Sequence, residues 1–224
     1  KVTSIGAMFA NMSSLESLSL RNFDTSSLQN MYNAFSGTSS LLYLDISSFN
    51  TTQVKKFGLM FKGSNLPTVN LSHFDTSSLI LMNETFANSG IINLDMSFNI
   101  DKSKIIDYSR MFSNTSIQFA RVSQNFKDAY SEKFPEIIAV SEVKCPKYKA
   151  GTEYVDRCPE EMKYSVNYIC FASCPQGTEV NEDAKVCLFP GQELPETCCQ
   201  DDQYIKGYFC YDCPDPCLRC AENH

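Results

Sequence analysis

Apolar residues return at a fixed interval along the first part of the chain. Five phenylalanines mark this interval, and successive ones are 26, 26, 25 and 26 residues apart: Phe9, Phe35, Phe61, Phe86 and Phe112. Each phenylalanine ends an apolar set with the spacing i, i+3, i+7, which is one face of two helical turns. The pattern therefore predicts short helices over residues 2–9, 28–35, 54–61, 79–86 and 105–112.

A different pattern follows each phenylalanine. In the first copy it is Leu15, Leu18, Leu20 and Phe23, and the same set recurs in the next two copies. The two central apolar residues alternate with polar ones, which is the period of a β-strand. Residues 23–26, 49–52 and 74–77 then place Asp or Asn before hydroxyl residues, the chemistry of a helix N-cap. Each repeat thus predicts a helix, a turn, a strand and a capping turn.

One such unit cannot bury its apolar face alone, but stacked units can. The repeats therefore predict an α/β solenoid over residues 1–144, with the five phenylalanines buried in one stacked column. The fifth copy is degenerate, with Ile117, Ala120 and Val122 at the strand positions. Residues 134–143 include Ile137 and Ile138, which predict a closing strand.

The order of these motifs resembles a known family. The Met-Phe pairs at Met8 and Met60, the Leu-x-x-Leu-x-Leu run from Leu15 and the Phe-Asp-Thr-Ser turn from Phe23 are similar to BspA-like leucine-rich repeats. The resemblance covers roughly residues 1–125. It implies a leucine-rich-repeat form of the α/β solenoid, with 25–26 residues per repeat, and a role in adhesion or surface coating.

Cysteine usage divides the chain. Residues 1–144 contain no cysteine, whereas residues 145–224 contain all 11. The charge divides at the same place, because the first part has 12 basic and 12 acidic residues and the second has 7 and 14. We therefore expect a second domain over residues 145–224, a small irregular module held by disulfides in an oxidising compartment. Its cysteines are Cys145, Cys158, Cys170, Cys174, Cys187, Cys198, Cys199, Cys210, Cys213, Cys217 and Cys220.

Two cysteine runs, from Cys170 to Cys187 and from Cys210 to Cys220, resemble furin-like or growth-factor-receptor repeats. That resemblance implies the pairs Cys174–Cys187, Cys210–Cys217 and Cys213–Cys220, in a rod that spaces or presents other domains. A four-thiolate zinc site in the last run is the rival interpretation. Only three residues separate its two Cys-x-x-Cys pairs, which is short for a zinc site, so disulfides are favoured. The odd count leaves one cysteine unpaired, or paired outside this segment.

Five Asn-x-Ser/Thr sequons lie in the solenoid part, and N-linked glycans are expected there if the source is a eukaryote. They are Asn11, Asn50, Asn70, Asn83 and Asn114. Asn70 lies between two inward residues, Val69 and Leu71, so its side chain is predicted to point out of the sheet.

Candidate catalytic residues are few. His73 lies beside Ser72 and Asp75, but all three fall in the repeated turn, and neighbours along one strand cannot converge as a catalytic triad must. Asp24 and Asp75 could bind a cation between stacked turns, although capping is the commoner role of such residues. We therefore expect no enzymatic activity, no metal and no cofactor other than glycans.

The charge and hydropathy of the chain disfavour two kinds of partner. Neither part is basic, which disfavours nucleic acid, and no apolar run is long enough to span a membrane. The chain begins at Lys1 without a signal peptide, so we expect a mature chain or part of one. A neutral solenoid whose first repeat starts at Val2 favours self-association through a solenoid end. The predicted function is an extracellular structural protein, the subunit of a filament or coat. The alternative is an adhesin or receptor ectodomain that binds a foreign surface protein or glycan.

Overall fold

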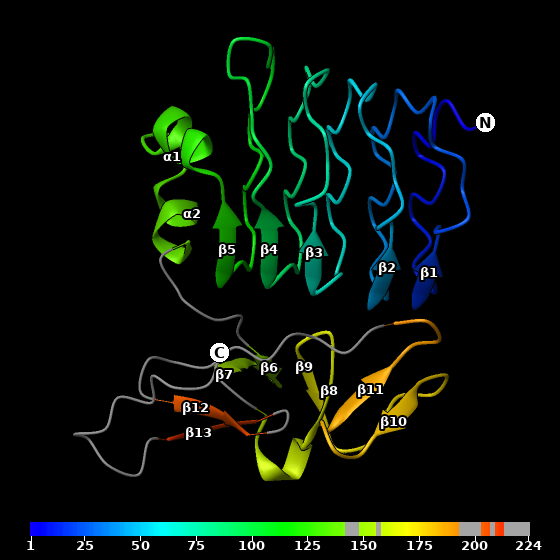
Figure 1. Cartoon of the computed structure of the whole chain (residues 1–224), viewed down its shortest axis with the longest axis vertical. Coiled ribbons are helices and arrows are strands. Elements are labelled where there is room, and N and C mark those ends of the chain that lie inside the picture. The colour runs from blue at the N-terminus through cyan, green and yellow to red at the C-terminus, as the bar shows by residue number, and fades with distance from the viewer. Residues whose placement is uncertain (142–147, 156–157, 193–202, 207–208, 213–224) are drawn as a thin grey trace. The chain divides into compact units, whose positions relative to one another are not determined.

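The computed structural model describes residues 1–141, 148–155, 158–192, 203–206 and 209–212. The chain divides into two compact units, Lys1–Glu142 and Val143–His224. Figure 1 draws the first from blue to green and the second from yellow-green to orange-red. We describe each unit by itself.

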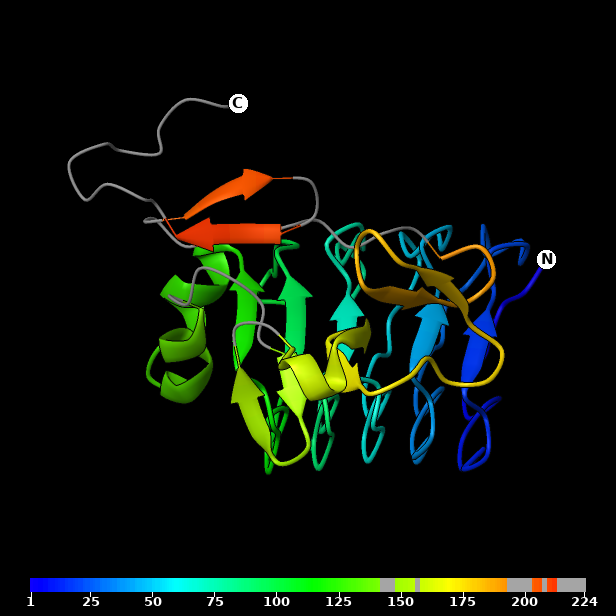
Figure 2. The same cartoon turned by 90° about the horizontal axis from the view of Figure 1, so that it is seen from below.

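The first unit is a solenoid, as predicted. Its five coils, numbered by Phe9, Phe35, Phe61, Phe86 and Phe112, each contain one short strand: β1 (Ser17–Ser19), β2 (Tyr43–Asp45), β3 (Thr68–Asn70), β4 (Asn93–Met96) and β5 (Phe119–Val122). Pairing is parallel, β1 with β2 and β4 with both β3 and β5. Figures 1 and 2 show the strands in one row. Leu18 faces Leu44, and Leu94 faces Ala120, so equivalent positions of neighbouring repeats are in register.

The predicted helices are absent from the repeats. Residues 2–11 and their equivalents, which we call the bridge segments, are chains of turns joined by parallel bridges through Ser4, Asn30, Lys56, Leu81 and Asp107. In coils 1 to 4, every second N–H group donates to the next coil, and none follows the pattern of an α-helix by donating four residues back. Ile5 donates to the Asn30 carbonyl at 3.0 Å, and Asn11 donates to Ser36 at 2.7 Å. The α part of the predicted repeat is therefore wrong, whereas its strand and solenoid parts are confirmed.

Two residues of each bridge segment adopt positive φ, which explains why no helix forms. In coil 1 they are Ala7 and Asn11, with φ of 54° and 60°. The second of these positions is Asn or Gly in every coil, the residues that best tolerate this conformation: Asn11, Gly37, Gly63, Asn88 and Asn114. A left-handed residue interrupts a right-handed helix after one turn. The i, i+3, i+7 spacing still brings its apolar side chains to one face.

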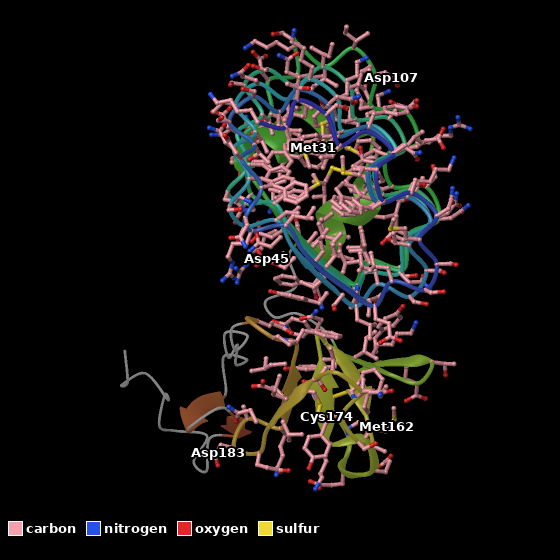
Figure 3. All side chains as sticks on the ribbon, turned by 90° about the vertical axis from the view of Figure 1, so that its right-hand side faces the viewer. Met31, Asp45, Asp107, Met162, Cys174 and Asp183 are labelled. Atoms are coloured by element: carbon pink, nitrogen blue, oxygen red, sulfur yellow. A yellow bond between two sulfur atoms is a disulfide. The ribbon has the colours of Figure 1, made fainter. Side chains whose placement is uncertain are left out.

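The phenylalanine column is stacked as predicted. Neighbouring rings lie 5.6, 5.7, 5.9 and 5.4 Å apart along the column and are tilted by 17° or less. Phe35, Phe61 and Phe86 are fully buried, and the two end rings are partly buried. Figure 3 looks along the solenoid and shows a ring of backbone filled with side chains, with Met31 inside and Asp45 and Asp107 on the outside.

Two helices cover coil 5: α1 (Gln124–Tyr130) and α2 (Pro135–Val140). Phe126, Tyr130 and Phe134 pack against Phe112 and Tyr108 of coil 5. A closing strand was predicted within residues 134–143, and that prediction is wrong, because residues 135–140 form α2. Pro135 stands at the start of the helix, where its fixed φ and missing N–H favour helix initiation. The solenoid is thus closed at this end by helices, which shield the last coil.

The second unit consists of short hairpins and is more regular than predicted. Six strands form one sheet in the order β10-β11-β8-β9-β6-β7, and β12 pairs with β13 separately. The elements are β6 (Tyr148–Ala150), β7 (Glu153–Val155), the 3₁₀ helix η1 (Glu160–Met162), β8 (Tyr164–Val166), β9 (Ile169–Phe171), β10 (Glu179–Asn181), β11 (Val186–Leu188), β12 (Gln203–Lys206) and β13 (Phe209–Asp212). Cys158 pairs with Cys170, and Cys174 pairs with Cys187, with Cα–Cα distances of 5.5 and 5.6 Å.

Candidate functional site

A concave surface of the solenoid lies where coil 4 carries an extra residue. The inward strand residue and the following turn residue are six positions apart in coil 3 (Val69 to Asp75) but seven in coil 4 (Leu94 to Asp101). The longer turn borders a groove of about 710 Å³. Its lining is His73, Phe74, Asp75, Thr76, Ser77, Asn99, Ile100, Asp101, Lys104 and Asn125. We call this the coil 4 groove.

The three residues considered as a catalytic set do not bond to one another. The Nε2 atom of His73 lies 3.1 Å from the Ile46 carbonyl oxygen, and the ring packs edge-on against Phe74. The Ser72 hydroxyl donates to Asn70 at 2.7 Å. The Asp75 carboxylate accepts the N–H of Ser77 at 2.8 Å. These polar atoms therefore hold the turn together.

The far side of the coil 4 groove is also held by internal bonds. The Lys104 ammonium lies 3.6 Å from Asp101 and donates to the Ser77 carbonyl at 3.0 Å, which ties coil 4 to coil 3. The Asn125 amide, at the start of α1, donates to the Ile100 carbonyl at 2.9 Å and accepts the Ile100 N–H at 3.4 Å. The groove is a mixed polar and apolar surface, and the bonds of its polar side chains fix the backbone.

Asp24 and Asp75, predicted to cap helices or bind a cation, close Asx turns. Asp24 accepts both the N–H and the hydroxyl of Ser26, at 3.1 and 2.6 Å. Asp101 accepts the same pair of donors from Ser103, at 3.1 and 2.6 Å. No three His, Cys, Asp or Glu side chains of the described residues gather as a metal site. The four cysteines of the rival zinc site lie outside the described side chains.

The hydroxyl donors set the acidity of these carboxyls. The hydroxyls of Ser26, Ser77 and Ser103, followed by their backbone N–H groups, hold the pKa values of Asp24, Asp75 and Asp101 below the usual range. Each turn therefore stabilises the charged form of its carboxyl in the folded state.

We expect the solenoid to lose stability in acid for this reason. A carboxyl whose pKa is lower in the folded state contributes stability above its unfolded pKa of about 3.9, and this contribution is lost as pH falls through the folded value. Urea unfolding midpoints should be flat from pH 7 to about 5 and fall below pH 4. Asp75→Asn keeps the acceptor oxygen, as Asn50 does in coil 2. The urea midpoint of this variant should therefore fall less steeply below pH 4 than that of the unchanged protein. An unchanged slope in this variant would contradict the assignment.

An ion network crosses three coils on the bridge segments. The Glu84 carboxylate lies 2.6 Å from Lys62 of coil 3 and 2.6 Å from Arg110 of coil 5. The Lys62 hydrogen bond, with the charges of Arg110 and Lys62, lowers the pKa of Glu84 against the opposing effect of desolvation. This network was not predicted from the sequence. Aligning the five repeats would have found it, because Glu84 and Arg110 occupy the same repeat position.

The sequon asparagines fall into two groups. Asn50 lies after strand β2 and Asn70 is the last residue of strand β3, and both are exposed. Asn11, Asn83 and Asn114 lie on the bridge segments, where Asn11 and Asn114 are exposed and Asn83 is half-buried. As predicted, Asn70 points away from the core between the buried Val69 and Leu71.

The cysteines are only partly placed. Cys174–Cys187 is the pair that the furin-like resemblance implies, and Cys158–Cys170 is a further pair. Cys145, Cys198, Cys199, Cys210, Cys213, Cys217 and Cys220 lie outside the described side chains, and so do the implied pairs Cys210–Cys217 and Cys213–Cys220. Disulfides persist in oxidising compartments, so the two observed bonds indicate a location outside the cytoplasm. Neither described α-helix has the length needed to cross a bilayer.

Comparison with known proteins identifies a family without a known activity. Residues 1–128 of the 224 match the family model described as "Mycoplasma protein of unknown function, DUF285". The match spans more than half of the chain, so the chain belongs to this family. No curated protein and no solved structure matches the chain.

Proposed function

We propose that this DUF285 chain is a non-enzymatic, extracellular structural protein of a cell surface, a subunit of a glycosylated coat or filament. The two disulfides of the second unit carry the extracellular part of the proposal. They bridge loops in a unit whose described buried core is small, so an oxidising environment would be required for its stability.

The use of polar side chains supports a structural role. In the coil 4 groove, His73, Asp75, Lys104 and Asn125 all contact backbone groups within the solenoid. A catalytic site needs groups that can exchange protons or bonds with a substrate. Here those groups hold neighbouring coils in register. The BspA-like resemblance, proposed from the repeat motifs, agrees with a role in coating or adhesion.

Self-association is part of the proposal, and the cap restricts where it can occur. Helices α1 and α2 stand over coil 5, where the first coil of another copy would have to stack. End-to-end stacking, the contact favoured by the sequence, is therefore disfavoured at this end. Lateral contacts between solenoids would satisfy the same function without displacing the helices.

The alternative is an adhesin or receptor ectodomain, and the coil 4 groove is the observation that favours it. A concave surface that bears His73, Asp75, Asp101 and Lys104 offers polar groups to a foreign protein or glycan. Asp101→Ala with Lys104→Ala would weaken such binding and should leave assembly of a coat unchanged.

The proposal is tested on intact cells of the source organism. We expect an antibody against the solenoid to label unpermeabilised cells, and electron microscopy to show the label on a continuous layer or filaments. Scattered label, with a purified chain that stays monomeric and binds foreign cells, would favour the adhesin. Label only after permeabilisation would contradict both functions.

A further inference from the structure

We infer that Asn50 and Asn70 are the two residues of this solenoid built to accept an N-linked glycan, and that the other three sequons are not. The inference rests on the proposed extracellular function in a eukaryotic source, because this glycosylation machinery acts only on chains that enter a secretory pathway. The five sequons are alike in sequence, and the contacts of each asparagine in the folded solenoid separate the two acceptors from the other three.

At both sites an Asx turn places the sequon hydroxyl on the carboxamide oxygen. The Oδ1 atom of Asn50 accepts the Thr52 N–H at 3.1 Å and the Thr52 hydroxyl at 2.8 Å. The Oδ1 atom of Asn70 accepts the Ser72 N–H at 2.9 Å and the Ser72 hydroxyl at 2.7 Å. Both asparagines are exposed, and no described residue hydrogen-bonds to either Nδ2 atom. The reacting nitrogen is therefore free at each site.

This arrangement suits the chemistry of N-glycosylation. A bond forms between Nδ2 and the anomeric carbon of an oligosaccharide carried on a lipid pyrophosphate, and the bond from that carbon to the pyrophosphate oxygen breaks. The pyrophosphate leaves with the electron pair, and Nδ2 loses one proton. Two hydrogen bonds donated to Oδ1 stabilise the negative charge that the carboxamide gains as this proton leaves. The nitrogen thus becomes easier to deprotonate without being blocked.

The sequon at Asn83 lacks this arrangement. Its hydroxyl belongs to Thr85, which is fully buried and donates to the Met82 carbonyl at 2.7 Å. The Asn83 oxygen itself lies against Gly58 of the preceding coil, only 2.4 Å from where a Cβ atom on that glycine would stand. A glycan attached here before folding would hold the bridge segment of coil 4 away from coil 3.

The sequons at Asn11 and Asn114 are occupied by contacts between coils. The Asn114 Nδ2 atom donates to the Asn88 oxygen at 3.1 Å. The Asn11 oxygen lies over Gly37 of coil 2, 2.5 Å from the position of a Cβ atom there. Both asparagines have positive φ, with values of 60° and 54°. In each case the carboxamide contacts a coil about 26 residues away, and among the described residues the hydroxyl of its own sequon, on Ser13 or Ser116, does not hydrogen-bond to it.

Glycans are added before the solenoid is fully folded, and this timing also favours Asn50 and Asn70 over the other three sequons. The Asx turns at Asn50 and Asn70 join groups two residues apart, so they can form before the solenoid does. The contacts of Asn11, Asn83 and Asn114 require the neighbouring coil. Asn70 ends β3, as Asp45 ends β2, and Asn50 follows β2, whereas the other three sequon asparagines lie on the bridge segments. Glycans would cover the strand side and leave the bridge segments bare for contacts with neighbours.

Site mapping on the full chain, secreted from a eukaryotic cell line, tests the inference. Enzymatic deglycosylation in ¹⁸O water marks each occupied asparagine by mass. We expect high occupancy at Asn50 and Asn70 and at least about tenfold lower occupancy at Asn11, Asn83 and Asn114, the difference that a 1.4 kcal/mol preference produces. Asn50→Gln and Asn70→Gln should each remove the mass of one glycan. Asn83→Gln is the matched control and should remove none.

The outcomes separate this inference from the proposed function. Bare Asn50 and Asn70 in the secreted chain, or equal occupancy at Asn83, would overturn the inference and leave the proposed location untouched. Glycans at both sites in the secreted chain, together with native protein found only inside unpermeabilised cells, would support the acceptor geometry and contradict the proposed function.

Discussion

Phe61→Ala will lower the free energy of unfolding of the solenoid by about 3–5 kcal/mol, the cost of deleting a fully buried aromatic side chain. Phe61 has no exposed surface and stacks between Phe35 and Phe86, with centroid distances of 5.7 and 5.9 Å. The cavity cannot close easily, because the coils above and below are fixed by parallel backbone hydrogen bonds. Urea unfolding followed by circular dichroism measures the loss.

The position in the column should matter as much as the residue. In a solenoid each coil contacts only its neighbours, so a weak central coil uncouples the two halves. We expect the Phe61→Ala unfolding transition to broaden, and hydrogen exchange to rise first in coils 2 to 4. Phe9→Ala is the matched control, since Phe9 is partly buried and stacks on Phe35 alone at 5.6 Å. Equal losses in the two variants would contradict a continuous column.

The phenylalanine column was predictable because equivalent residues of stacked repeats lie above one another whatever backbone conformation the repeat adopts. Phe9, Phe35 and Phe61 had to occupy equivalent places once the interval was known. The strands were predictable for the same reason, since Leu18 and Leu44 alternate with polar neighbours. The outward direction of Asn70 followed directly from this alternation.

The helices were wrongly predicted because the i, i+3, i+7 spacing does not determine where backbone hydrogen bonds go. Each bridge segment has two residues with positive φ, four positions apart, and in coils 1 to 4 every second N–H group of the segment donates to the next coil. The sequence contains a signal for this, namely Asn or Gly two residues after each phenylalanine, as at Asn11 and Gly37. Asn11 was instead interpreted only as a sequon. Asparagine is both the sequon residue and a residue that tolerates positive φ, and only the backbone conformation shows which property matters at Asn11.

The closing strand was wrongly predicted because a short apolar run with Ile137 and Ile138 fits a strand or a buried helix face equally well. Pro135 decided the outcome by starting a helix. The Glu84 network and the coil 4 groove depend on which side chains of different coils meet. That information appears only when the repeats are aligned and the extra residue before Asp101 is located.

Reduction of the disulfides should unfold the second unit and leave the solenoid folded. The solenoid part, residues 1–144, contains no cysteine, so a reductant has no bond to break there. In the second unit, Cys158–Cys170 and Cys174–Cys187 close loops of 12 and 13 residues. Loops of this length contribute about 3 kcal/mol each by restricting the unfolded chain. The described apolar core of the unit cannot replace that contribution, because it consists of a few side chains around Val166, Val186 and Phe189.

Limited proteolysis of the full chain, with and without dithiothreitol, measures the effect. We expect the oxidised chain to resist cleavage in both units, and the reduced chain to yield a protected fragment that ends near residue 142. Cys170 and Cys187 are almost fully buried, so reduction is carried out in mild urea to expose both bonds. The paired variant Cys158→Ser with Cys170→Ser removes one bond without leaving a free thiol. The variant should lower the free energy of unfolding of the second unit alone, by about 2–5 kcal/mol.

The contrast between the units makes this experiment informative about where the protein works. A second unit that stays protease-resistant after complete reduction would be stable by packing alone, and its disulfides would then no longer require an oxidising compartment. If it unfolds as expected, the same unit would be unfolded at the reducing potential of a cytosol. The folded two-unit chain could then exist only where thiols are oxidised. That location is the one that the proposed extracellular function requires.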